Sequence, residues 1–107
     1  MPQRSVFFVS DGTGITAETF GNSILAQFAA KPRHVRRPFI DTVDKAHAAA
    51  RKINEAAIAD GQRPIIFSTL VQAELSSVIR QCSGLHMDLF QSFVAPLEEE
   101  LGMKSTH

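Results

Sequence analysis

The sequence predicts an α/β fold built on a four-stranded, mainly parallel sheet with helices on both faces. Short runs of β-forming residues alternate four times with segments whose apolar residues recur at helical spacing. That alternation is typical of parallel sheets with right-handed crossovers. The chain has 107 residues, of which 44% are hydrophobic, so it is long enough and apolar enough for one domain with a core.

The first strand is predicted at residues 6–9, an unbroken apolar run that indicates burial on both faces. A helix follows from Ile15 and ends before Lys31-Pro32, with Gly21 allowing close packing against a neighbour. The second strand is predicted at residues 34–40. Pro38 lacks a backbone donor, which indicates an edge position or a bulge, and we expect a Rossmann-like strand order of 2-1-3-4 with this strand at an edge.

Residues 41–44 supply caps for a second helix that Gly61 ends, and residues 64–67 form the third strand. The third helix is closed by Gly84, and a weaker fourth strand covers residues 86–90. Ser92 caps a short last helix, with Pro96 near its first turn and Gly102 at its end. The residues expected on the buried faces of the four helices are Ala17, Phe20, Ile24, Leu25 and Phe28; Ala46, Ala49, Ala50, Ile53 and Ala57; Val71, Leu75, Val78, Ile79 and Cys82; and Phe93, Leu97 and Leu101.

The charge balance argues against nucleic acid or a membrane surface as a partner. Lys and Arg total 11 and Asp and Glu total 11, so the formal net charge is zero. The charge is uneven, since residues 1–53 carry 8 basic and 4 acidic groups, a surplus of 8 − 4 = +4. No apolar run approaches the ~20 residues of a membrane-spanning helix. Cys82 is the only cysteine, which fits a reducing compartment and predicts a cytoplasmic protein.

Ligands of open parallel sheets bind beyond the carboxyl ends of the strands. Four segments rich in hydroxyl and carboxylate groups follow the predicted strands, at residues 10–14, 41–44, 68–69 and 91–92. In the first, two glycines let backbone amides approach an anion, and Ser10, Thr13 and Thr16 add hydroxyl donors. An ordinary strand-to-helix turn capped by Asp11 or Thr13 explains the same residues equally well. The segment matches neither the P-loop nor the dinucleotide-binding glycine pattern.

The remaining polar residues carry weaker signals. A basic cluster of Lys31, Arg33, His34, Arg36 and Arg37 is either a docking patch or, as we favour, a solvated edge strand. No histidine has metal-ligand spacing to another histidine or to Cys82, so no metal site is predicted. We expect an exposed His47, a His86 that opens a strand and a Cys82 that belongs to the core.

One block of residues resembles a known family. Residues 4–19, including the block SDGTGITAE at 10–18, are similar to the N-terminus of the phosphoenolpyruvate synthase regulatory proteins, relatives of the pyruvate, phosphate dikinase regulatory proteins. Similar segments at 64–71, 88–90, 96–98 and 101–105 extend the resemblance over nearly the whole chain. It implies an N-terminal α/β domain at 1–102 and a polar tail at 103–107, leading to a C-terminal P-loop domain that this sequence does not contain.

The resemblance also implies a function for the parent protein. Family members are bifunctional: they phosphorylate a threonine of phosphoenolpyruvate synthase or pyruvate, phosphate dikinase with ADP as donor, and remove it with inorganic phosphate, releasing pyrophosphate. The present chain alone is expected to be inactive and to bind ADP or phosphate weakly. The alternative is a non-catalytic module for target binding or homodimerisation. Asp11 and Thr13 become catalytic candidates, and the candidates for binding phosphate or target are Ser10, Gly12, Gly14, Thr16, Glu18, Ser68 and Thr69.

Overall fold

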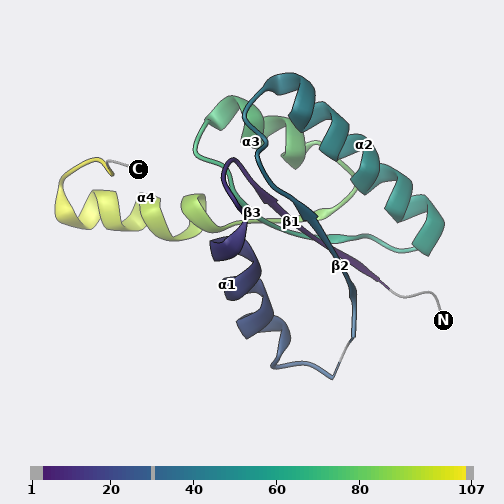
Figure 1. The fold of residues 1–107 in the computed structure, drawn as a ribbon. Helices are drawn as coiled ribbons and strands as arrows, with labels where there is room; N and C mark the ends of the chain where they lie inside the picture. The colour runs from purple at the N-terminus through teal and green to yellow at the C-terminus, as the bar shows by residue number, and fades with distance from the viewer. Residues whose placement is uncertain (1–3, 30, 106–107) are drawn as a thin grey trace.

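The computed structural model describes residues 4–29 and 31–105 and shows four strands alternating with four helices (Figure 1). The sheet order is β2-β1-β3-β4, and all three pairings are parallel. The predicted fold class and strand order are therefore confirmed. The strands are β1 (Ser5–Ser10), β2 (Arg33–Arg37), β3 (Ile65–Thr69) and β4 (Leu85–Asp88), and the helices are α1 (Ile15–Leu25), α2 (Val43–Asp60), α3 (Ala73–Arg80) and α4 (Leu89–Leu101).

Helices cover both faces of the sheet, as predicted. In Figure 1, α2 and α3 lie on one face, while α1 lies on the other. All six residues of β1 are buried, and alternate residues feed the two cores. Phe7 and Val9 pack toward α2 and α3, whereas Val6 and Phe8 pack toward α1 and the start of α4. This alternation follows from the two-residue period of a strand.

Gly21 allows α1 to approach the sheet closely. A Cβ atom at this position would lie 2.6 Å from Cε1 of Phe8 and 2.9 Å from Cδ2 of Phe67. The two rings are stacked, with centroids 6.0 Å apart. The close packing expected of Gly21 is therefore confirmed. It sets the distance between α1 and the sheet, and with it the position of the loop that precedes α1.

The predicted end of α1 is wrong. The helix stops at Leu25, because the amides of Gln27 and Phe28 bond to carbonyls three residues back instead of four. Only Ala17 and Gly21 of α1 are buried, and Phe20 and Leu25 are half-buried at the core edge. Ile24 and Phe28, expected on the buried face, are exposed because α1 runs away from the sheet (Figure 1).

The second and third helices depart less from expectation. Gly61 ends α2 in the left-handed conformation, and the side chain of Thr42 caps its start, as predicted. Ala56 of α2 is buried, whereas the predicted Ala50 and Ala57 are half-buried, so the stripe is rotated slightly. The helix α3 ends at Arg80, not at Gly84, and Val71 precedes it as an exposed loop residue. Gly84 instead packs against Ile66 and Ile53, where a Cβ would come within 3.3 Å of both.

The last helix differs most from the prediction. It starts at Leu89, and Asp88 is its cap, because the carboxylate accepts a hydrogen bond from the Gln91 amide at 3.0 Å. Ser92 is therefore not the cap, and Pro96 lies inside the helix. The predicted apolar stripe exists but is not buried: Phe93, Leu97 and Leu101 are all more than half exposed.

Candidate functional site

The carboxyl ends of β1 and β3 lie side by side at the centre of the sheet. Ser10 is opposite Thr69 in the register, and the helices that follow these two strands lie on opposite faces of the sheet. This reversal creates the topological switch point where ligands of open α/β sheets bind. A hydrogen bond joins the two loops, because Oδ2 of Asp11 accepts from the Val71 amide at 3.2 Å.

The glycine-rich loop at residues 10–14 is held by one internal hydrogen bond and by bonds from the segment after β2, where the amides of Phe39 and Ile40 donate to the carbonyls of Gly12 and Ser10 at 2.8 Å. Ser10 is buried, and its Oγ accepts a hydrogen bond from the Gly12 amide at 3.0 Å. Gly14 has a φ of 85°, a left-handed conformation that favours glycine, and it is the N-cap of α1. The N-cap position is taken by Gly14, so neither Asp11 nor Thr13 is the N-cap residue, although the Thr13 side chain does contact the first amide of α1.

The polar side chains around the loop form an open surface. Thr13 and Thr16 are exposed, while Asp11 and Glu18 are half-buried. Oγ1 of Thr13 accepts only a long contact of 3.4 Å from the Ile15 amide. The Gly12 amide already bonds to Ser10, so it is not available to a ligand, whereas the hydroxyl-bearing Thr13 and Thr16 are exposed.

Arg36 of the edge strand β2 binds the glycine-rich loop and the first turn of α1. Its Nε lies 2.9 Å from Oε2 of Glu18, and its terminal nitrogen donates to the Thr13 carbonyl at 3.1 Å. At the other end of the same strand, Arg33 pairs with the buried Asp60 at 3.3 Å. These pairings, together with the edge position of β2, favour the edge-strand interpretation of the basic cluster over a docking patch.

Ser68 and Thr69 are both buried, and neighbouring strand residues point to opposite faces of the sheet. They therefore cannot act as one cluster. Thr69 lies on the same face of the sheet as Ser10. Ser68 lies on the same face as His86 of β4, and its Oγ is 2.7 Å from Nε2 of His86.

Of the other predicted segments, residues 41–44 include Asp41, which pairs with Lys45 at 2.8 Å. That hydrogen bond lowers the pKa of the Asp41 carboxyl.

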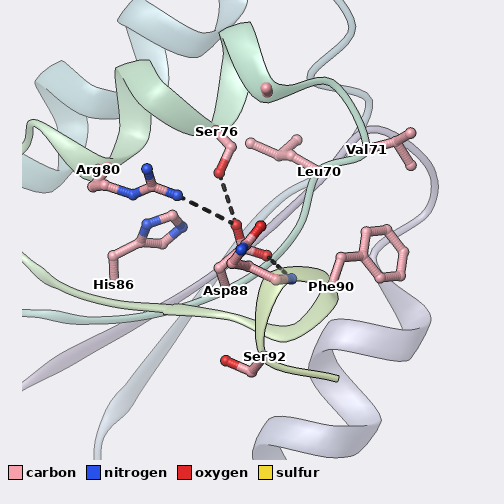
Figure 2. Close-up of a pocket in the computed structure, with 10 residues that line it drawn as sticks. Leu70, Val71, Ser76, Arg80, His86, Asp88, Phe90 and Ser92 are labelled. Atoms are coloured by element: carbon pink, nitrogen blue, oxygen red, sulfur yellow. Dashed lines mark hydrogen bonds and ion pairs between the residues drawn. The ribbon is translucent and has the colours of Figure 1, made fainter. Parts of the chain in front are cut away.

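A polar groove of about 620 Å³ opens where β3 and β4 end (Figure 2). Its centre is Asp88, whose Oδ2 accepts from Oγ of Ser76 at 2.9 Å and lies 3.8 Å from Arg80. The residues that line the groove are Leu70, Val71, Ala73, Ser76, Arg80, His86, Asp88, Phe90, Gln91 and Ser92. Val71, which lines the groove, also bonds to Asp11, so the groove adjoins the glycine-rich loop.

His86 is the titratable residue of this groove whose charge is most affected by its surroundings. Burial lowers its pKa below the ordinary 6.5, against the nearby Asp88 carboxylate, while Arg80 adds to the lowering. The imidazole is therefore neutral at pH 7 and can accept a proton. It lies inside β4 as the second residue, so the expectation that it opens the strand is wrong by one position.

Sequence reasoning did not identify Ser76, Arg80, His86 and Asp88 as one cluster, because they come from two elements and bear no motif spacing. A usable signal was present in β4, where polar His86 and Asp88 alternate with apolar Leu85 and Met87.

Residues 4–29 and 31–105 contain no group of three or more His, Cys, Asp or Glu placed to hold a metal ion. Among the same residues, no helix has the length and apolar character needed to cross a bilayer.

The architecture defines the chain as a Rossmann-like α/β fold, with its candidate site at the carboxyl edge of the sheet. Over residues 6–107 the sequence matches the family described as Kinase/pyrophosphorylase, and the chain belongs to that family. It is 71% identical over 97% of its length to a protein of Janthinobacterium sp. (strain Marseille), and 69% identical over 97% to one of Herminiimonas arsenicoxydans. A third relative, from Polaromonas sp. (strain JS666), is 67% identical over the whole chain.

These three relatives share the printed name "Putative phosphoenolpyruvate synthase regulatory protein". The chain spans only 37% to 40% of their lengths. The family resemblance of the SDGTGITAE block is therefore confirmed, while the activity of the longer proteins concerns a larger molecule.

Proposed function

We propose that this chain is the N-terminal part of a bifunctional enzyme that regulates phosphoenolpyruvate synthase in the cytoplasm. The parent enzyme transfers a phosphoryl group from ADP to a threonine of the synthase, and removes it with inorganic phosphate to release pyrophosphate. The observation that carries this proposal is the family match over residues 6–107, supported by the shared name of relatives up to 71% identical.

The carboxyl edge gives this part of the enzyme a role in positioning the target. Phosphoryl transfer is catalysed mainly by positioning and by charge stabilisation. The nucleotide is held by the P-loop domain that the family resemblance implies, and the present chain supplies the surface for the target threonine. Exposed Thr13 and Thr16 and the adjoining groove of about 620 Å³ offer hydroxyl groups and space for a peptide segment.

His86 suits the proton transfer that the reaction needs. The threonine hydroxyl loses a proton when it is phosphorylated and regains one on phosphorolysis. A half-buried imidazole that is neutral at pH 7 can take and return such a proton, and it lies on the groove beside Asp88. Asp11 has a different part, since its bond to Val71 keeps the loop and the groove in one continuous surface.

A chimeric enzyme tests this function. The segment of the Janthinobacterium relative that matches this chain is replaced by residues 1–107, which are 71% identical to it. With ADP and phosphoenolpyruvate synthase, the chimera should produce phosphothreonine detectable by mass spectrometry, and with phosphate it should release pyrophosphate. The unfused chain should do neither. A folded chimera that is inactive while the relative is active would contradict the proposal. Phosphorylation by the unfused chain would contradict the expectation that the P-loop domain is needed for the reaction.

Variants of the chimera then separate the roles at the carboxyl edge. Replacing Thr13 and Thr16 together by Ala should raise KM for the protein target about tenfold, equivalent to ~1.4 kcal/mol of binding, with little change in kcat. His86→Gln should lower kcat and remove an ionisation from its pH profile. Asn22→Ala, an exposed change on α1 away from the loop, is the control and should behave as the parent chimera. If KM and kcat were unchanged in both the groove variant and the loop variant, this surface would not be the one that receives the target.

A further inference from the structure

The last helix carries an apolar stripe that the domain itself does not cover. Residues Leu89, Phe93, Leu97 and Leu101 recur every four positions and so lie along one side of α4. Of the thirteen residues of α4, only Leu89 is buried. Phe93, Leu97 and Leu101 are 53% to 65% exposed, although the Phe93 ring touches Phe20 edge-on with centroids 5.5 Å apart.

This exposure is unusual for a helix of this length. Helices shorter than ~12–15 residues are marginal by themselves in water and owe their stability to packing of the apolar face. Pro96 weakens α4 further, because it lacks the amide that would bond within the helix. In Figure 1, α4 leaves the sheet and projects away from the other elements. The helix therefore needs a packing partner that the described residues do not provide.

The backbone beyond α4 creates a groove beside the stripe. Gly102 has a φ of 66° and reverses the chain, and the Met103 amide donates to the Glu98 carbonyl at 3.2 Å. The Ser105 amide donates to Oε2 of the same glutamate at 2.7 Å, so residues 103–105 run back along α4 (Figure 1). A groove of about 400 Å³ results, lined by Val94, Leu97, Glu98, Leu101, Met103, Lys104 and Ser105.

We infer that the apolar stripe and the groove of α4 form the surface that binds the part of the family protein that this chain does not contain. The relatives are long enough to supply it, since the chain spans only 37% to 40% of their lengths. The returning residues 103–105 direct the backbone alongside the stripe. This inference rests on family membership and not on the activity proposed above.

A second copy of this chain is a poorer occupant of the surface. Glu98 lines the groove with Leu97 and Leu101, Glu99 and Glu100 follow it in α4, and the last turn of α4 has no basic residue. Two copies packed through α4 would bring two such acidic segments together, and like charges across an interface oppose association. A segment with apolar side chains and basic groups at its rim would instead match both the stripe and the glutamates.

Hydrogen exchange followed by mass spectrometry tests the inference without any enzymatic assay. The amides of residues 93–101 are compared in the 107-residue chain and in the chimera, in which the rest of the relative follows this sequence. Exchange in the chain alone should be fast, and the chimera should slow it by at least about tenfold, because local opening then requires separation of the covered stripe. Equal exchange rates in the two proteins would overturn the inference.

Matched variants locate the contact. Leu97→Asp in the chimera should restore fast exchange in α4 while β1 and β3 stay protected. Ile58→Asp is the control, since Ile58 is an apolar residue on α2 that is 84% exposed, and it should leave α4 protected. Retained protection in Leu97→Asp would contradict the contact. Protection in the unfused chain that grows with concentration would mean that a second copy is the occupant, and would also overturn the inference.

If the chimera does not fold, the natural Janthinobacterium relative and its own matching N-terminal segment give the same comparison. The helix that corresponds to α4 should exchange more slowly in the full relative. Because exchange needs no ADP and no target, an inactive chimera with a protected α4 would refute the proposed function alone.

Discussion

The approach of α1 to the sheet gives the most quantitative prediction, through the substitution Gly21→Ala. In an exposed helix this change would stabilise the protein by up to ~1 kcal/mol, because alanine has the higher helix propensity. Here the added Cβ would lie 2.6 Å from Phe8 and 2.9 Å from Phe67. Both rings are buried and stacked on each other, so neither can swing aside freely.

Overpacking of a core costs ~1–3 kcal/mol, which exceeds the gain in propensity. Gly21→Ala should therefore lower the free energy of unfolding by about 1 to 2 kcal/mol. With a urea dependence of ~2 kcal/mol/M, the midpoint should fall by roughly 0.5–1 M. The chain has neither Trp nor Tyr, so far-ultraviolet circular dichroism is the suitable probe.

The control is Asn22→Ala, the next residue of the same helix, which is exposed and should be neutral or slightly stabilising. A Gly21→Ala protein as stable as the parent would refute the argument that contact with the two rings fixes α1. The amide resonances of Gly12 and Gly14 provide a second readout. They should shift in Gly21→Ala alone, because the loop begins the helix that has been displaced.

Three further predictions follow from individual contacts. Asp11→Ala should lower the free energy of unfolding by about 0.5–1.5 kcal/mol and speed exchange of the Val71 amide, since it removes their hydrogen bond; unchanged exchange would show that the bond is absent in solution. Because burial lowers the pKa of His86, the free energy of unfolding should fall as pH drops from 6.5 through the lower pKa of the folded state. The urea midpoint should therefore be lower at about pH 5.5 than at about pH 7.5, and His86→Gln should reduce that difference. Burial raises the pKa of the Cys82 thiol, so iodoacetamide should label the folded chain much more slowly than the urea-unfolded chain; equal rates would contradict its place beside the core.

The sequence predicted β1 and α2 most accurately, because the apolar run of β1 and the alanine stripe of α2 carry their own periodicity. The edge position of β2 was also predicted correctly, although Pro38, on which it rested, follows the strand. Boundaries were less accurate, because local cues competed. Glycine is typical of a helix end, but Gly84 instead allows Ile66 to pack closely against its backbone.

The candidate site was only partly predictable. The segments at the strand ends followed from topology, and Ser10, Asp11 and Gly14 do lie at the switch point between β1 and β3. The groove around Asp88 did not follow, because it depends on α3 placing Ser76 and Arg80 above β4. The separation of Ser68 from Thr69 onto opposite faces is likewise a consequence of strand geometry.

The fold class and the family were predictable from the sequence, because they rest on local periodicity and on a continuous block of residues. The strand order rested on the edge position assigned to the second strand, and which apolar residues are covered depends on tertiary contacts. Periodicity shows that Phe93, Leu97 and Leu101 share one side of a helix, but burial depends on whether another surface reaches that side. The sheet ends at β4 and α4 extends past it, so the stripe that the sequence assigned to the core is exposed.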